Sequence, residues 1–190
     1  MEIDVRGLDC PQPVIKTRLA LEESLDGSVT VIIDNSATRD NVKRFAESQG
    51  CSVSVEERNG EFSLKIVKGC PARSTPQKAP GVIAYVESDT MGRGSEELGK
   101  ILMRAFLKTV PEITPGITKL IFINNGVRLT TEGSDLIETL KDLEDRGIEI
   151  FSCGTCLDFF HLLDRVKVGK VSNMFEIVTM LANSDKIIKP

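Results

Sequence analysis

A proline-rich stretch between residues 69 and 80 is the feature that most constrains how this chain can fold. The stretch holds three prolines and shows no apolar periodicity. Proline breaks helices and is excluded from central strands, so such a stretch is typical of a partly extended linker. The 190 residues are enough for two small domains. We therefore expect one domain at residues 1–70, a linker at 71–80 and a second domain at 81–190.

The first domain is predicted to have the element order βαβαββ. Four strand-like runs are separated by two helical patterns, and Asn59-Gly60 lies between the last two runs. An Asn-Gly pair between alternating runs is a strong hairpin signal. The expected strands are 3–5, 29–33, 51–57 and 61–67, and the apolar helix residues are Val14, Ile15, Leu19, Leu21 and Leu25, then Val42, Phe45 and Ala46. These patterns predict a two-layer α/β sandwich, with two helices on one face of a mixed sheet.

The second domain is predicted to be an α/β domain with a mainly parallel sheet. Residues 82–86 are almost continuously apolar, as in a strand buried on both faces, and helical patterns alternate with the strands that follow. The expected strands are 82–86, 118–123 and 148–151, with short ones at 166–168 and 186–189. Helices are expected at 134–145, from about 156, and at 173–182.

An earlier helix of this domain has apolar residues at the spacing i, i+3, i+4, i+7 and i+8. They are Leu98, Ile101, Leu102, Ala105 and Phe106. This spacing predicts that they form the face lying on the sheet. In such sheets ligands bind beyond the carboxyl ends of the strands, so the loops at 87–95, 124–133 and 152–156 are the candidate site.

Composition excludes several classes of protein. The net charge is −4, tryptophan is absent and Tyr85 is the only tyrosine. Without a basic stripe or stacking aromatics, nucleic acid is not an expected partner. No apolar run approaches the ~20 residues of a membrane helix, and no export signal is apparent at the N-terminus. We expect a cytoplasmic location and no membrane partner.

The segment Cys10-Pro11-Gln12-Pro13 carries the clearest chemical signal. Proline suits the first turn of a helix, so the two prolines predict a helix start with Cys10 at its mouth. The helix dipole and the free N–H groups of the first turn favour a thiolate at this place. A small buried hydrophobe before a helix is the alternative interpretation of Cys10. Placement and rigidity favour a functional, nucleophilic or sulfur-carrying cysteine.

A second thiol motif, Cys153-Gly154-Thr155-Cys156, follows a predicted strand and precedes a helix. The helix dipole again favours a thiolate in at least one of the pair. A structural zinc site needs four ligands, and no second such pair exists within the chain, which leaves only a site shared between subunits. Two packing cysteines are another alternative. We favour a redox or sulfur-handling dithiol, because adjacent thiols can resolve a persulfide or mixed disulfide. No metal or cofactor is expected.

The other candidate residues carry weaker signals. Five cysteines in a chain without an export signal argue against a disulfide framework, and a single histidine, His161, argues against a hydrolytic triad. His161 is expected to be a half-buried helix residue without a catalytic role. Cys51 is expected in the core, and Cys70 is either an accessory thiol or an exposed linker residue. The loop 89–95 favours a tight turn over an anion cradle, because no nucleotide motif matches it.

The N-terminal motif resembles the TusA/SirA-like family of sulfur carriers over about 70 residues. The resemblance rests on the pattern D-x-x-G-x-x-C-P-x-P followed by an arginine. The matching residues are Asp4, Gly7, Cys10, Pro11, Pro13 and Arg18. It implies that Cys10 holds sulfur as a persulfide, and that Arg18 could fold back to stabilise the terminal anion.

The second half resembles the DsrE/DsrF-like family in its strand–helix order and around residues 91–94 and 125–127. The fusion of the two resembles YedF-like proteins linked to selenium metabolism. The resemblance implies a role in sulfur or selenium transfer and self-association into a homo-oligomer.

Our hypothesis is a two-domain sulfur or selenium relay. Cys10 would accept the chalcogen from a cysteine desulfurase or another donor, and Cys153 and Cys156 would receive it or discharge it toward an acceptor protein. Two alternatives remain open. The protein could be a dithiol oxidoreductase working at Cys153 and Cys156, or a regulatory or scaffolding module without turnover.

Overall fold

A computed structural model describes residues 1–58, 60–69, 81–113 and 116–190. The chain forms two compact units, one made mainly of residues 1–69 and the other mainly of residues 81–190. The predicted linker, Cys70 and Asn59 of the predicted turn lie outside the described residues. Within the described ranges, no helix is long and apolar enough to cross a membrane.

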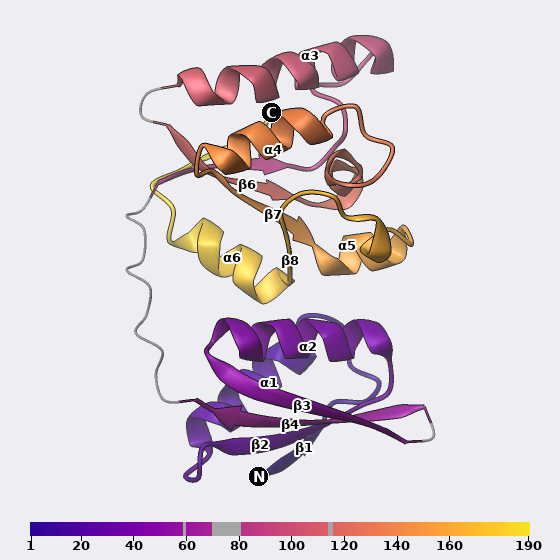
Figure 1. The fold of residues 1–190 in the computed structure, drawn as a ribbon, viewed down its shortest axis with the longest axis vertical. Coiled ribbons are helices and arrows are strands. Elements are labelled where there is room, and N and C mark those ends of the chain that lie inside the picture. Colours follow the sequence, from indigo (N-terminus) through magenta and orange to yellow (C-terminus); the bar gives the residue numbers. More distant parts are fainter. Residues whose placement is uncertain (59, 70–80, 114–115) are drawn as a thin grey trace. The chain divides into compact units, whose positions relative to one another are not determined.

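The first unit has the predicted order of elements and a four-stranded mixed sheet (Figure 1). The strand order is β1-β2-β4-β3, with β1 parallel to β2 and the other pairs antiparallel. The helices α1 and α2 lie together on one face of this sheet. The elements are β1 (Glu2–Asp4), α1 (Gln12–Glu23), β2 (Ser28–Ile33), α2 (Ser36–Ser48), β3 (Cys51–Arg58) and β4 (Glu61–Lys68).

The core of the first unit follows the alternation of its strands. Alternate residues of β2 and β4 are fully buried and face the two helices; they are Val29, Val31, Ile33, Leu64 and Ile66. On α2, the predicted residues Val42, Phe45 and Ala46 are buried as expected. On α1 the prediction is partly wrong: Leu19 is 43% exposed, and Leu25, beyond the end of the helix, is fully exposed. The face of α1 that packs is instead completed by Pro13, Thr17 and Ala20.

The second unit is built on a parallel five-stranded sheet in the order β8-β7-β6-β5-β9. The helices α3 and α4 cover one face, and α6 lies on the other (Figure 1). Its strands are β5 (Val82–Val86), β6 (Ile117–Phe122), β7 (Glu149–Cys153), β8 (Lys170–Ser172) and β9 (Lys186–Ile188). Its α-helices are α3 (Glu96–Thr109), α4 (Ile137–Asp145), α5 (Gly154–Phe159) and α6 (Met174–Ala182), and three short 3-10 helices are η1 (Val110–Glu112), η2 (Asn124–Thr130) and η3 (Leu163–Arg165).

One predicted strand of this unit is wrong. Residues 166–168 make only an isolated bridge, between Val166 and Thr131, and the strand that joins the sheet is β8. The predicted strand contained the apolar residues Val166 and Val168. Val168 is buried in the core, but it does not join the sheet.

The predicted orientation of α3 is wrong for four of its five residues, and only Phe106 is partly buried and packs against the core as expected. Leu98, Ile101, Leu102 and Ala105 are exposed, while Gly99, Met103 and Leu107 are buried and face the core. A Cβ atom on Gly99 would lie 2.8 Å from the Cβ of Thr90, so the helix approaches the loop after β5 most closely at this glycine. Gly99 also accepts a hydrogen bond from the N–H of Met91. This close approach turns the side of α3 that carries Gly99 inward and the side that carries Leu98 and Ile101 outward.

The three candidate loops meet at one edge of the sheet, because β5, β6 and β7 are parallel and end together. The first and second loops are joined by a hydrogen bond from the Gly126 N–H to the Glu87 carbonyl, 3.3 Å long. The second and third are joined where the N–H of Asn124 donates to the Sγ of Cys156. The parallel sheet therefore brings the predicted loops together around the C-x-x-C motif.

Candidate functional site

Cys10 lies at the mouth of α1, as its two prolines predict. Pro11 is the N-cap residue and Pro13 occupies the first turn. The peptide bond between Cys10 and Pro11 is cis. The cysteine is free and half-buried, so its sulfur is neither sealed in the core nor fully in solvent. This position suits a thiol that must exchange a group with another molecule.

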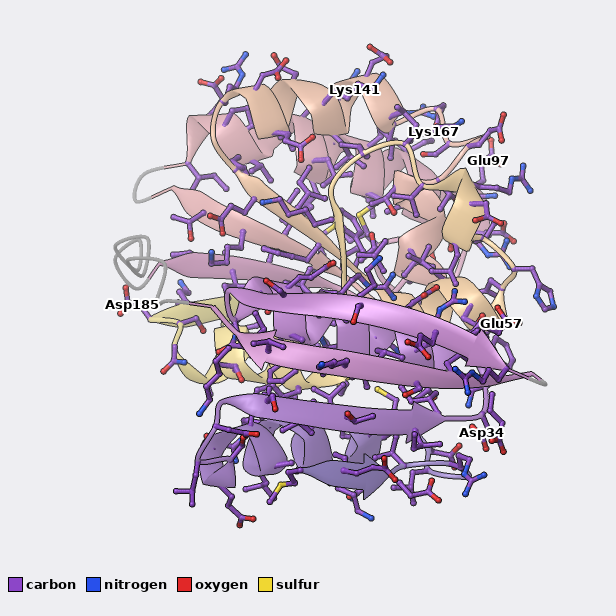
Figure 2. All side chains as sticks on the ribbon, turned by 60° about the horizontal axis from the view of Figure 1, so that its bottom comes forward. Asp34, Glu57, Glu97, Lys141, Lys167 and Asp185 are labelled. Carbon is purple, nitrogen blue, oxygen red and sulfur yellow. The ribbon has the colours of Figure 1, made fainter. Side chains whose placement is uncertain are left out.

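The loop before Cys10 is held by groups that its sequence motif contains. The Asp4 carboxylate accepts hydrogen bonds from the Arg6 N–H and guanidinium, and these bonds lower the pKa of Asp4 to about 2. Gly7 has a φ of +69°, a left-handed conformation that glycine adopts without strain. Its N–H donates to the Asp34 carboxylate at 2.7 Å. Asp34, labelled in Figure 2, directly follows β2 and was missed by sequence reasoning.

The expected stabilisation of an anion at Cys10 is not arranged as predicted. Arg18 is paired with Glu22 at 2.6 Å, one turn further from the helix mouth, so it does not fold back toward the cysteine. The Gln12 N–H is bonded to the Asp9 carbonyl, and the two prolines have no N–H. None of Pro11, Gln12 and Pro13 therefore offers a free N–H to Cys10, and the helix dipole remains one source of positive potential at the start of α1.

The second thiol site lies where β7 passes into α5. Cys153 is the last residue of β7 and the N-cap residue of α5, and its side chain is fully buried. Cys156, in the first turn of α5, is half-buried. Its Sγ accepts the Asn124 N–H at 3.1 Å from the neighbouring loop. The structure therefore places one inner and one outer sulfur at the same helix start.

The two thiols differ strongly in acidity. A hydrogen bond from the Cys153 thiol lowers the pKa of Cys156 to about 6, burial opposes this shift, and the Asn124 N–H supports it. The hydrogen bond to Cys156 and burial raise the pKa of Cys153 far above its ordinary range. An ordinary cysteine has a pKa of about 8.5. At neutral pH the pair is thus a monoanion, with the thiolate on Cys156 and the proton on Cys153.

The buried hydroxyls of Thr130 and Ser152 hold the loop that contains Asn124 against the end of β7. The Thr130 hydroxyl donates to the Val127 carbonyl at 2.9 Å, so its oxygen accepts from the hydroxyl of Ser152 at 2.8 Å. Ser152, the neighbour of Cys153, is fully buried. The bond ties the end of β7 to η2, the segment that supplies the Asn124 N–H.

We expect Thr130→Val to destabilise the second unit by about 1–3 kcal/mol, because it leaves the buried Ser152 hydroxyl without a partner. Urea denaturation of the full chain, followed by circular dichroism, measures the loss. Thr130→Ser is the matched control, since it keeps the hydroxyl and removes only a methyl group. Equal losses for the two variants would mean that packing, and not the hydrogen bond, supports the loop.

Tyr85 also belongs to the surroundings of the dithiol. Burial raises the pKa of the Tyr85 phenol, and the negative charges of Glu87, Cys153 and Cys156 raise it further. The sequence prediction considered Tyr85 only when the aromatic residues were counted, and assigned it no role. The signal that could have found it is its position near the carboxyl end of β5, beside the candidate loops.

Other predicted positions differ or gain no role. His161 is not a half-buried helix residue: it is exposed, with a φ of +55°, beyond the end of α5. Cys51 begins β3 and packs partly buried against the first core, where burial raises its pKa. In the loop 89–95, the Thr90 N–H donates to the Ser88 hydroxyl and the Met91 N–H to Gly99. These donors are used within the fold, which favours a tight turn over an anion cradle.

A cavity of about 550 Å³ opens at the same edge of the second sheet, lined by residues of the loop 128–136 and of α3. Two of its four basic side chains are paired with acidic ones of the lining: Arg104 pairs with Asp135, and Arg165 lies 3.6 Å from Glu132. None of its described lining residues is a cysteine. Beyond these two pairs the lining holds Lys100, Arg128 and Asp89, so it carries one more basic than acidic residue.

The fold and the two thiol sites define a class: a two-unit α/β protein with a helix-mouth cysteine on one unit and an asymmetric dithiol on the other. Residues 93–190 match the model of the DsrE/DsrF-like family, and residues 1–68 match that of Sulfurtransferase TusA. The chain belongs to the DsrE/DsrF-like family through its second unit and to the TusA family through its first.

Individual relatives match mainly the first unit. A protein of Methanocaldococcus jannaschii named "Putative sulfur carrier protein" is 42% identical over 69 residues, which cover 35% of this chain and 92% of that protein. One of the same name from Archaeoglobus fulgidus is 40% identical over 66 residues, or 34% of this chain and 75% of that protein.

Solved structures are similar to parts of this chain. A SirA-like protein from Desulfitobacterium hafniense is 39% identical, with a TM-score of 0.34 over 36% of this chain and 97% of that one. The ychN protein from E. coli is 12% identical, with a TM-score of 0.47 over 58% of this chain and 99% of that one.

Proposed function

We propose that this protein relays sulfur, carrying it as a persulfide on Cys10 and passing it on through Cys156. The observation that carries the proposal is the pairing of a half-buried cysteine at the mouth of α1 with a dithiol whose outer member has a pKa of about 6. Membership of the TusA family and the similarity to proteins named as sulfur carriers support the first half of the relay. The expected partners are a cysteine desulfurase or another donor and an acceptor protein.

Loading and transfer need no outside oxidant. The donor's persulfide gives its terminal sulfur to the Cys10 thiolate, and the donor regains a thiolate. The Cys156 thiolate then attacks the terminal sulfur of Cys10–S–SH. One S–S bond forms at Cys156 as the one at Cys10 breaks, and Cys10 leaves as a thiolate. Because Cys156 is largely ionised at neutral pH, it is the member of the pair suited to this attack.

Release of the sulfur uses the second thiol. Cys153 attacks the Sγ of the Cys156 persulfide and forms the 153–156 disulfide, and the outer sulfur departs as hydrosulfide. The dithiol loses two electrons, the departing sulfur gains them, and the proton of Cys153 goes to the leaving group. Alternatively, an acceptor thiolate attacks the outer sulfur directly, and the dithiol stays reduced. A selenium cargo would follow the same bond changes.

The proposal is tested by incubating the full chain with a cysteine desulfurase and cysteine, and then locating added sulfur by mass spectrometry of its peptides. Sulfur should appear on the peptide that contains Cys10, and Cys156→Ser should raise its level there by blocking onward transfer. Replacing cysteine by selenocysteine, with a lyase as donor, compares the two chalcogens. No adduct with either donor would overturn the carrier role.

A second candidate function, a dithiol oxidoreductase, is favoured by one observation: the shared proton of Cys153 and Cys156. It predicts a reversible 153–156 disulfide and an activity that survives Cys10→Ser. A scaffolding protein without turnover predicts instead that partner binding is unchanged when all the cysteines are replaced. The same set of Cys→Ser variants therefore separates the three functions.

A further inference from the structure

The cavity near the dithiol has the size and the lining of a small-molecule site. Its volume of about 550 Å³ lies within the range of about 300–1,000 Å³ that is usual for ligand pockets in proteins. Three leucines form the apolar part of its lining, and none of them is more than 6% exposed: Leu129, Leu136 and Leu162. Charged side chains of α3 and of the loops make up much of the rest. An occupant therefore needs a short carbon skeleton that carries ionised groups.

Arg128 is the basic residue of this cavity that can hold an anion. Its guanidinium lies over the ring of Phe160, 4.5 Å from the ring centre, and its Nε donates to the side-chain oxygen of Asn125 at 3.5 Å. Among the residues that the structure describes, Arg128 forms no ion pair, whereas each of the other three basic residues of the lining does. A planar guanidinium that rests on an aromatic ring can present its remaining N–H groups to a carboxylate as a fork.

The same arginine connects the cavity to the sulfur of Cys156. Phe160 lies one helical turn beyond Cys156, and its N–H donates to the Cys156 carbonyl at 3.1 Å. Side chains at this spacing lie on the same face of a helix, with their Cβ atoms about 5–6 Å apart. Both side chains are half-buried and pack against the same core. A molecule held by Arg128, which lies on Phe160, can therefore extend along α5 to Cys156.

The charges of the cavity indicate which small molecule fits. Asp89 accepts a hydrogen bond from the Ser88 hydroxyl at 3.4 Å but forms no ion pair within the described part of the chain. An unpaired arginine and an unpaired aspartate in one cavity suit a ligand that carries both a carboxylate and an ammonium group. Thiols built from amino acids have these groups. A tripeptide, about 10 Å long when extended, is long enough to pass one helical turn of 5.4 Å.

We propose that this cavity binds a low-molecular-weight thiol that carries a carboxylate and an ammonium group, and that this thiol is the acceptor of the sulfur on Cys156. The inference rests on the proposed relay for the loading of Cys156. The thiolate of the bound molecule attacks the outer sulfur of Cys156–S–SH. A new S–S bond forms as the bond to Cys156 breaks, the outer sulfur keeps its proton, and Cys156 leaves as a thiolate. The products are a small persulfide and the reduced dithiol, so no oxidant is needed.

Binding is tested with S-methylglutathione, which has the charged groups of a tripeptide thiol but cannot accept sulfur. Isothermal titration calorimetry of the full chain measures its affinity. Arg128→Gln should weaken binding at least about tenfold, because it removes the charge that pairs with the carboxylate. Arg146→Gln is the matched control, since Arg146 is exposed at the end of α4 and does not line the cavity. No binding to the unchanged chain, or an affinity that Arg128→Gln leaves unaltered, would overturn the proposal.

Transfer is tested on chain that a desulfurase has loaded and that is then freed of the donor. Glutathione and its diethyl ester are compared at equal concentration, because the ester keeps the thiol and the ammonium group but has no carboxylate. Glutathione should discharge Cys156 at least about tenfold faster than the ester, and this advantage should disappear in Arg128→Gln. Mass spectrometry of the Cys156 peptide, and of the small persulfide after alkylation, measures the rates.

The outcomes separate this proposal from the relay on which it rests. Equal rates with glutathione and its ester, or a loaded chain that only an acceptor protein discharges, would overturn the small-molecule acceptor and leave the relay standing. A chain that takes up no sulfur contradicts the relay itself, and calorimetry with S-methylglutathione then still decides whether the cavity binds such a molecule.

Discussion

Cys10→Ser is expected to abolish the sulfur that a cysteine desulfurase adds to the chain. Serine keeps the size of the side chain, and the loop before it is held by Asp4, Gly7 and Asp34, none of which bonds to the sulfur. The variant should therefore fold normally and lose only the thiol. Without that thiol no persulfide can form at the mouth of α1, and Cys156 should also receive no sulfur from the donor. Intact-protein mass spectrometry after desulfurase treatment measures both losses.

The matched control for this experiment is Cys51→Ser. Cys51 lies in the same unit and is also free and half-buried, but burial raises its pKa, and it begins a strand and precedes no helix-starting proline. It should load like the unchanged chain. A Cys10→Ser variant that still carries donor-derived sulfur on Cys156 would show that the second unit is loaded directly, and the relay order proposed above would be wrong.

The second large effect concerns the acidity of Cys156. Its reaction with iodoacetamide, followed on its own peptide in the reduced chain, should rise with pH through a midpoint of about 6. Cys153→Ala removes the thiol that donates to this sulfur. Only the Asn124 N–H then favours the thiolate, so the midpoint should move by more than one pH unit toward the ordinary value of about 8.5.

The midpoint is the informative quantity, and the rate at one pH is not. A thiolate of higher pKa is intrinsically more nucleophilic, so the variant's smaller thiolate fraction is partly offset in its rate. Cys153→Ser keeps a hydroxyl that can donate, and its midpoint should lie between those of the other two chains. A midpoint unchanged in Cys153→Ala would mean that the two thiols do not share a proton.

The sequence predicted both thiol sites, but it did not predict which cysteine of the C-x-x-C motif is buried and which is acidic. Proline at a helix start and a C-x-x-C after a buried strand are local signals, and they placed Cys10, Cys153 and Cys156 correctly at the starts of α1 and α5. The acidity of Cys156 depends on the Asn124 N–H and on the burial of Cys153. Those contacts come from another loop, 32 residues away, and the motif alone does not contain them.

Helix orientation was the main failure of the fold prediction. The exposed side of α3 has four apolar residues, whereas the buried side has two and a glycine, so a periodicity based on hydrophobicity selected the wrong side. The inner side is decided by Gly99, whose missing side chain allows close packing on Thr90. Likewise Arg18 was expected at the helix mouth, but its nearest acidic neighbour at helical spacing, Glu22, holds it elsewhere. The order of elements along the chain and the parallel pairing of the second sheet were predicted better, because buried strands have a distinctive composition.

The single proton held between Cys153 and Cys156 has a consequence for the release of cargo. A departing hydrosulfide needs a proton, and an attacking thiol must give one up. When Cys153 attacks, both needs are met inside the site, so the discharge step neither takes a proton from solvent nor returns one. The inner cysteine then serves as nucleophile and as acid in the same event, so the proton taken up by the leaving sulfur is the one that Cys153 gives up.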